Sequence, residues 1–454
     1  MPHHVSQIVP ASISNGQSVA EIKPLEINEF YLILKSLNLE KIKGKIALAV
    51  SGGPDSIALS YLMSLWSQKS GINVYAFTVD HRLRADSLID AKFAEQQCKN
   101  FGISHKILTW NQSSITLSGL QNKARNARYR LLRNACDEIG AKVLITAHHS
   151  KDQAETFLIR LSHESGLDGL SAMKPKQDFK DLIILRPLLK ISKEKLILTL
   201  IKHCIPWVYD PMNRDKKFSR AKMRSIICNN NFIEEKAIRA SQIFLKLKNY
   251  LDLATNNLVK EKIQLYLTGH VVIERDTLKN IPKILVIRLL SRIIWQIGGK
   301  NYPIKSKKIY RLTSIVYSNT STKISLGGCL INIKEREINI LREPGRIEKK
   351  PLKVFPNSSS IWDGRFYIKN KSHQKTLLIY PLRDYRSLYN FQNLKKYHKY
   401  KLPYAVYLSM PVFFYLDEQP IKPHLHICGS KKWSNKIEVK LLLNQIVDFD
   451  LNIA

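Results

Sequence analysis

Acidic residues are scarce in this sequence. Only 37 of its 454 residues are Asp or Glu, whereas 72 are Lys or Arg, so the formal net charge is +35. A charge of this size attracts polyanions over long distances, which makes nucleic acid the first candidate partner and an anionic membrane surface the second. Net charge describes association and does not indicate a fold.

Long hydrophobic runs are also missing. No stretch approaches the ~18 uninterrupted apolar residues that a membrane-spanning helix requires. Residues 1–25 lack the basic start and apolar core of a signal peptide. We therefore expect a soluble protein of the cytoplasm, not held in a membrane, with a loose extension over residues 1–25.

Cysteine is infrequent, and its spacing excludes several kinds of site. No two cysteines form a CxxC pair, so neither a zinc knuckle nor an iron–sulfur cluster is indicated. A disulfide framework is not expected in a chain of this size without a secretory signal. The six cysteines are Cys98, Cys136, Cys204, Cys228, Cys329 and Cys428.

Short apolar runs alternate with helical patterns from residue 45 to about residue 166. Such alternation predicts an α/β fold, a doubly wound parallel sheet with helices on both faces. The expected strands cover residues 45–50, 74–80, 104–110 and 142–147, and the expected helices cover residues 56–66, 85–102 and 121–139, with a further helix from residue 150.

The pattern changes beyond about residue 230. Helical spacing continues, and shorter strand-like runs begin near residue 320, as in KISLGGCLINI, EINILRE and IWDGRFYI. We expect one domain over residues 26–228, a mainly helical domain over 229–345 and a small α+β domain over 346–454. Basic clusters that suit phosphate contacts lie at 305–311, 346–353, 394–401 and 431–436, interleaved with Tyr310, Tyr397, Tyr400 and Trp433.

The stretch LAVSGGPDS, residues 48–56, joins the first expected strand to its helix. Gly52 and Gly53 allow close backbone approach, and Pro54 suits the first helical position. The free N–H groups of such a helix start favour an anion, so the loop is suited to cradle phosphate. It has no lysine, unlike the nucleotide loop of kinases and GTPases, and no GxGxxG. Asp55 instead indicates Mg²⁺ between the carboxylate and a polyphosphate, or an acid that complements the helix dipole.

Four motifs, in order, resemble one enzyme family. SGGxDS is the loop of the PP-loop ATP pyrophosphatases, and it is followed by VDHRLRADS (79–87), GLQNKARNARYRLL (119–132) and TAHHSKDQAETFLIRLSHESGLDGLSAM (146–173). Together they resemble the tRNA(Ile)-lysidine synthetases. RPLL (186–189) and the segment 207–224 extend the resemblance, which is weaker in the C-terminal half.

The resemblance implies an adenine nucleotide alpha hydrolase-like fold and a ligase activity. It makes residues 26–228 the ATP-binding catalytic domain, 229–345 a tRNA-binding domain and 346–454 a tRNA-recognition domain. Members of this family use ATP to adenylate the wobble cytidine of tRNA(Ile), and free lysine then displaces AMP. ATP and Mg²⁺ are the cofactors implied, tRNA(Ile) and L-lysine the partners, and a homodimer is left open.

The resemblance also assigns roles to particular residues. Asp55 and Asp152 are expected to hold Mg²⁺ and to act in catalysis together with His148. The alternative for Asp152 is a helix-capping role, because Ser150-x-x-Gln153 has the form of a capping box. The residues expected to bind ATP are Ser51, Gly52, Gly53, Pro54, Asp55, Ser56, Asp80 and His81.

Four arginines are expected to bind substrate. Arg125 and Arg128 are three residues apart and share a helix face, where guanidinium groups suit phosphate or the lysine carboxylate. Arg220 and Arg224 lie in a basic run that suits the tRNA backbone. The alternative for each is a solvated basic surface.

The sequence departs from the family pattern at two places. Lys151 stands where many relatives have a second acid, and Asp210-Pro211-Met212-Asn213 replaces DxSN. Three other functions remain as alternatives: a PP-loop tRNA thiolase, an amidotransferase-type nucleotide or NAD synthetase, and a non-catalytic RNA-binding protein. The lack of CxxC disfavours the thiolase, and the net charge of +35 disfavours the nucleotide or NAD synthetase. The presence of both Asp55 and Asp152 disfavours a non-catalytic protein.

Overall fold

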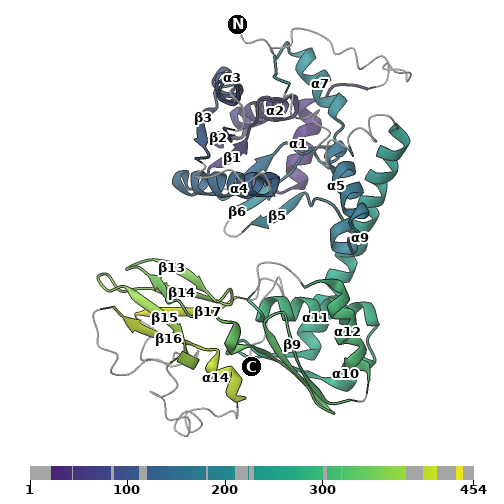
Figure 1. Cartoon of the computed structure of the whole chain (residues 1–454). Helices are drawn as coiled ribbons and strands as arrows, with labels where there is room; N and C mark the ends of the chain where they lie inside the picture. The colour runs from purple at the N-terminus through teal and green to yellow at the C-terminus, as the bar shows by residue number, and fades with distance from the viewer. Residues whose placement is uncertain are drawn as a thin grey trace. The chain divides into compact units, whose positions relative to one another are not determined.

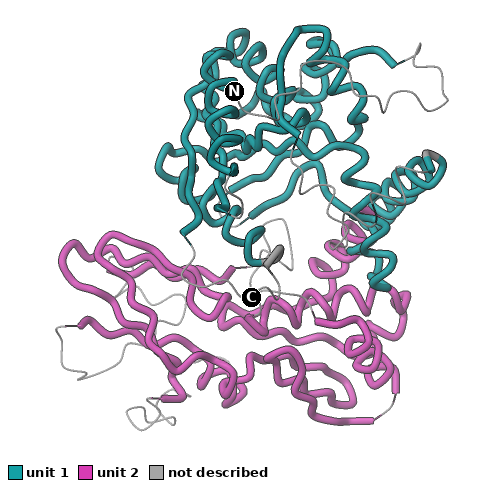
Figure 2. The backbone as a smooth tube through the Cα atoms, turned by 45° about the horizontal axis from the view of Figure 1, so that its top comes forward, with its two compact units in different colours: residues 1–248 teal, residues 249–454 magenta. Residues whose placement is uncertain are grey.

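A computed structural model of the chain divides into two compact units, residues 1–248 and 249–454 (Figure 2). The predicted domain border at 228/229 lies outside the described residues, and that at 345/346 falls in a short 3-10 turn, Pro344–Arg346. The structure describes residues 22–42, 44–82, 86–111, 120–179, 182–209, 223, 230–299, 304–318, 320–384, 402–416 and 436–442.

The first unit is built on a six-stranded sheet in the order β3-β2-β1-β4-β6-β5. All neighbouring strands are parallel except β5, which runs antiparallel to β6 at the edge. The predicted parallel sheet is confirmed. The strands are β1 (Ile46–Ala49), β2 (Val74–Asp80), β3 (Ser104–Thr109), β4 (Val143–Thr146), β5 (Lys176–Phe179) and β6 (Leu182–Leu185).

Helices cover both faces of this sheet (Figure 1). One core packs the sheet against α1, α2, α3 and α7, and a second packs its other face against α4. Burial on both faces explains why β1 is apolar throughout and why β4 is apolar up to its last residue, Thr146. The helices are α1 (Ile27–Ser36), α2 (Pro54–Ser70), α3 (Ser87–Asn100), α4 (Leu120–Ile139), α5 (Ser150–Ser162), α6 (Leu167–Leu170) and α7 (Lys193–Lys202).

The strand order places a switch point at β1 and β4. The chain leaves β1 toward β2 on one side, whereas β4 pairs with β1 on the other. Ala49 is opposite Thr146 in the register, so both strands end at the same level. In doubly wound sheets ligands bind outside the carboxyl ends of strands at such a point. The loops that follow β1 and β4 are therefore neighbours.

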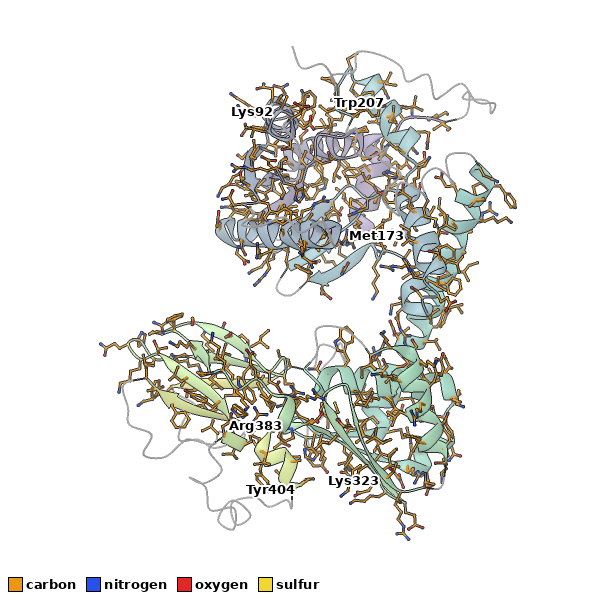
Figure 3. The ribbon with its side chains drawn as sticks, viewed as in Figure 1. Lys92, Met173, Trp207, Lys323, Arg383 and Tyr404 are labelled. Atoms are coloured by element: carbon orange, nitrogen blue, oxygen red, sulfur yellow. The ribbon has the colours of Figure 1, made fainter. Side chains whose placement is uncertain are left out.

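Helix α5 is fixed behind this point by an amide clamp. The Gln153 side chain donates to Met173 O and accepts from Met173 N, both at 2.8 Å (Met173 is labelled in Figure 3). Ala154 and Phe157 of α5 pack against Ala237 of α9 (Asn231–Lys262) in a small apolar core. The first turn of α5 is thus held rigidly by buried contacts.

The second unit begins with helices on an antiparallel sheet. The sheet order is β7-β8-β11-β10-β9, and α11 and α12 pack on it through one apolar core. Strands were predicted here only beyond residue 320, so β7 and β8 were not anticipated. The elements are β7 (Ile263–Leu265), β8 (Val271–Glu274), α10 (Arg275–Lys279), α11 (Lys283–Ile297), α12 (Ser306–Tyr317), β9 (Thr322–Leu326), β10 (Cys329–Ile333) and β11 (Glu337–Arg342).

Two three-stranded antiparallel sheets complete the unit, with orders β12-β15-β16 and β13-β14-β17. Their facing side chains form one apolar core. The elements are β12 (Leu352–Val354), β13 (Ser359–Trp362), β14 (Phe366–Asn370), β15 (Leu377–Pro381), α14 (Tyr404–Leu408), β16 (Pro411–Tyr415) and β17 (Ile437–Leu441).

Two buried guanidinium groups share one carboxylate in this unit. Asp363 accepts from Arg342 at 2.6 and 2.8 Å and from Arg365 at 2.8 Å. The remaining contacts of the arginines include the carbonyls of Gly328 and Ser409. The turn that carries Asp363 is therefore tied to β11 and α14 by charged hydrogen bonds.

The helices within the described ranges include none that is both long and apolar enough to cross a membrane.

Candidate active site

The loop between β1 and α2 is folded onto its own helix start. Ser56 Oγ accepts from the Ser51 amide at 3.1 Å and donates to Gly53 O at 3.0 Å. The amides of Ser56 and Ile57 are also directed to Gly53 O. In the described part of the chain, the amides of Gly52 and Gly53 have no hydrogen-bond partner. Such unoccupied N–H groups at a helix start favour an anion.

Position 52 requires a residue without a side chain. Its φ is +83°, and a Cβ there would lie 3.3 Å from the carbonyl oxygen of Asp90 on α3. The Gly52 carbonyl also accepts from the Val208 amide at 3.1 Å. The loop is thus held from both sides in a backbone conformation that glycine adopts most easily.

Gly52→Ala is expected to destabilise the protein and to weaken ATP binding. Left-handed backbone costs a residue with a Cβ about 1–2 kcal/mol, and here the contact with Asp90 O adds to that cost. Gly71→Ala is the matched control, because Gly71 ends the same helix at φ +71° with nothing within 4 Å of its Cβ position. Urea unfolding and ATP titration measure both effects. Equal ATP affinity in the two variants would contradict a role for the Gly52 loop.

The two predicted acids, Asp55 and Asp152, meet at one histidine. His149 Nε2 lies 3.5 Å from Asp55 Oδ2 and 3.6 Å from Asp152 Oδ2. The imidazole is buried, with 4% of His149 exposed. Burial by itself lowers the pKa of His149, but Asp152 and Asp55 together raise it above its ordinary value. The three side chains form a compact charged group at the switch point.

His149 also caps α5. Its Nδ1 accepts from the Lys151 amide at 3.2 Å, and Asp152 Oδ2 accepts from the His149 amide at 3.1 Å. The capping box is therefore formed by His149 and Asp152, and the one predicted from Ser150 and Gln153 is wrong by one position. Capping and contact with Asp55 are compatible, since they use the two different nitrogens of the imidazole.

Two further cations, Lys193 and Lys151, lie beside this group. Neither was predicted from the sequence to act in the site. Lys193, at the start of α7, has its Nζ 3.8 Å from Asp55 Oδ2. Lys151 Nζ lies 3.5 Å from Glu234 Oε2, on α9. Burial raises the pKa of Glu234 more than Lys151 lowers it. The helix starts of α2, α5, α7 and α9 thus contribute charged side chains to one region.

A second group gathers at the carboxyl end of β2. Asp80 Oδ1 accepts from the Arg82 amide at 2.9 Å and from Ser87 Oγ at 2.7 Å, which holds the turn into α3. Arg128 Nε donates to His81 Nε2 at 3.4 Å. Burial, followed by Arg128, lowers the pKa of His81 to about 4, so its imidazole is neutral near pH 7.

The remaining predicted residues lie elsewhere. His148 Nδ1 lies 2.9 Å from Thr146 Oγ1, at the end of β4. Arg125 is exposed, and its guanidinium lies 5.2 Å from the Tyr129 ring centroid. Arg220 and Arg224 lie outside the described residues. The roles assigned to these residues stay predictions.

The acids offer part of a cation site. Asp55 Oδ1 is buried and finds no hydrogen-bond partner in the described ranges. Those ranges contain no group of three or more His, Cys, Asp or Glu residues that could hold a metal. Mg²⁺ commonly uses one or two carboxylates together with the oxygens of a bound phosphate. Asp55 and Asp152 fit that donor set once a nucleotide supplies the rest.

Known proteins with the same pattern decide the family. Residues 27–231 match the PP-loop domain family. The tRNA(Ile)-lysidine synthase of Wolbachia pipientis wMel is 33% identical over 418 residues, which cover 90% of this chain and 94% of that relative. The chain belongs to the tRNA(Ile)-lysidine synthase family.

Other relatives agree with this membership. The tRNA(Ile)-lysidine synthase of Rickettsia typhi (strain ATCC VR-144 / Wilmington) is 30% identical, with 87% of this chain and 92% of that relative covered. Among solved structures, the U34-tRNA thiolase NcsA from Methanococcus maripaludis is similar at 20% identity and a TM-score of 0.41, covering 48% of this chain and 80% of that one. A likeness that weak carries no argument about function.

Membership in the tRNA(Ile)-lysidine synthase family agrees with the resemblance found in the motifs. The cysteines are informative here, because burial raises the pKa of Cys98, Cys136 and Cys329 to about 12. Within the described ranges Cys204 is the one exposed cysteine. A buried thiol of this kind is not a nucleophile at neutral pH.

Proposed function

We propose that the protein joins L-lysine to the wobble cytidine of tRNA(Ile) at the expense of ATP. The observation that carries the proposal is the meeting of Asp55, His149 and Asp152 beside the SGGPDS loop. Family membership supports the choice of tRNA(Ile), since the relatives are tRNA(Ile)-lysidine synthases. The formal net charge of +35 suits an RNA substrate.

The chemistry has two steps. The cytosine carbonyl oxygen attacks the α-phosphorus of ATP, and pyrophosphate leaves with the bonding electrons. The lysine amine then attacks the ring carbon that carries this oxygen. AMP leaves with the oxygen, and the attached amine loses a proton. The first step makes a good leaving group from a poor one, which is why ATP is consumed.

The loop is suited to hold the pyrophosphate portion of ATP. Partial positive charge is provided there by the open amides of Gly52 and Gly53 and by the start of α2. This charge favours a bound phosphate. Lys193, beside Asp55, adds a full positive charge where negative charge grows on the leaving group. Asp55 and Asp152 would hold Mg²⁺, which when bound neutralises phosphate charge. His149 orients both carboxylates.

The thiolase alternative fits the described thiols poorly. Sulfur transfer needs a reactive thiolate or a cluster-binding CxxC, and the sequence has no CxxC. The buried Cys98 and Cys136 have pKa values raised to about 12. The lysine ligation reaction requires no cysteine.

Mass analysis of nucleosides tests the proposal. A transcript of tRNA(Ile) with a wobble cytidine is incubated with the protein, ATP, Mg²⁺ and lysine, then digested. We expect lysidine in place of one cytidine, and none when ATP, Mg²⁺ or lysine is omitted. A sulfur-containing nucleoside formed with a sulfur donor would support the thiolase instead, and an unchanged tRNA would support the non-catalytic alternative.

A further inference from the structure

Helix α9 has a line of exposed side chains on one face. The positions follow each other at intervals of four, three, four and three residues, which keeps them in line on an α-helix. All are exposed, including Phe232 at 66% and Ile243 at 59%. This α9 stripe consists of Phe232, Lys236, Arg239, Ile243 and Lys246.

The other side of the same helix is committed to the first unit. Ala237 packs against Ala154 and Phe157 of α5, and Ser241 is buried. Lys248 forms an ion pair with Asp168. Since the inward face already has its contacts, the α9 stripe is not needed to hold the helix in place.

The charges of the α9 stripe have one sign. Lys236, Arg239 and Lys246 form no ion pair with any described residue. The Lys236 Nζ lies 5.0 Å from the Phe232 ring centroid, so a cation and an exposed aromatic ring lie next to each other. Glu235, beside the stripe, forms no ion pair with Arg239 there.

The first turn of α9 lies beside the catalytic group, and the α9 stripe lies on the opposite side of this turn. Glu234, two residues from both Phe232 and Lys236, reaches Lys151 at 3.5 Å. Lys151 in turn immediately precedes Asp152. The α9 stripe is therefore accessible to an RNA backbone that runs along the outside of the first unit while a base occupies the catalytic group.

We propose that the α9 stripe binds the sugar–phosphate backbone of the tRNA. The inference rests on the proposed function for the identity of the RNA. The helix rises about 21 Å from Phe232 to Lys246, which is long enough to follow several phosphates. The three cations supply charge for phosphate oxygens, and Phe232 supplies a stacking surface. A second copy of this chain is disfavoured as occupant, because like charges would face each other.

The test compares two triple variants with equal loss of charge. Lys236→Gln, Arg239→Gln and Lys246→Gln remove the cations of the stripe. Lys41→Gln, Lys99→Gln and Lys142→Gln form the control, because these exposed lysines lie in the same unit near the amino ends of the strands. Affinity for the tRNA(Ile) transcript is measured at several salt concentrations, and ATP binding reports that the catalytic unit is folded.

We expect the stripe variant to bind tRNA at least about tenfold more weakly than the control, with unchanged ATP affinity. The slope of the logarithm of its binding constant against the logarithm of the salt concentration should also be shallower by about two to three. Each phosphate contact contributes ~0.7–0.9 to this slope. Phe232→p-benzoylphenylalanine should cross-link to the tRNA on irradiation.

Equal affinity and salt dependence in the two triple variants would overturn the inference. The inference would also be overturned if Ile243→Ser sedimented as a smaller species than the wild-type protein while the stripe variant bound tRNA normally. The face would then be an interface between protein copies. Binding is measured without turnover, so a wild-type protein that makes no lysidine would refute the proposed function while the comparison of variants still decides the role of α9.

Discussion

Asp55→Asn is expected to reduce lysidine formation by about a hundredfold to a thousandfold, the loss typical of removing a preorganised charged group from a reacting centre. The substitution keeps the size of the side chain and removes the charge that would hold Mg²⁺ through the buried Oδ1. It also takes away one of the two carboxylates that His149 contacts. tRNA-dependent exchange of pyrophosphate into ATP measures the adenylation step by itself.

Asp137→Asn is the matched control for this variant. Asp137 lies at the end of α4, where its exposed carboxylate is 3.9 Å from Arg133 Nε. An exposed pair of this kind contributes little, so exchange should stay near the wild-type rate. Affinity for tRNA should be unchanged in both variants. Normal exchange by Asp55→Asn would refute the assignment of Asp55 to the nucleotide site.

Asp363→Ala is expected to lower the free energy of unfolding of the second unit by about 3–5 kcal/mol, the range typical of breaking a buried ion pair. Asp363 is the shared acceptor of two guanidinium groups, and the three side chains are at most 5% exposed. Burial is also the main cause that lowers the pKa of Arg365. Without the carboxylate, two buried positive charges would lie beside each other.

Hydrogen exchange measured by mass spectrometry can locate this loss. Protection should fall in the strands and helices described for the second unit, whereas the first unit, which has its own cores, should keep its protection and its affinity for ATP. Asp276→Ala is the control, because Asp276 forms an exposed pair with Lys279. Equal unfolding midpoints for the two variants would show that the buried charges are compensated in another way.

The parallel sheet could be predicted because its signals are local. Short apolar runs such as residues 45–50 and 142–147 need cover on both faces, and the helices between them supply it. The SGGPDS loop also follows from its own residues, since glycine, proline and the helix start determine its shape. Asp55 and Asp152 were expected in one crevice because both follow strands that end at the same edge.

The choice of histidine could not be predicted from the motif. His148 and His149 are adjacent, and the sequence analysis favoured His148. In the folded chain His149 is the N-cap residue of α5, so one of its nitrogens takes part in the cap and the other faces both acids. The deciding factor is the residue at which the helix starts, and the catalytic role of His148 stays a prediction.

The sequence alone determined the parallel sheet and the glycine turn at the start of α2, because periodicity and turn chemistry act between near neighbours. Only the tertiary structure decided that Lys193 reaches Asp55, that Glu234 reaches Lys151 and that Asp363 joins Arg342 to Arg365. Apart from Asp363 and Arg365, these partners are tens of residues or more apart in the chain. Charged side chains on surface-like helices have the same local pattern whether or not they meet, so their pairing is fixed by the packing of whole elements.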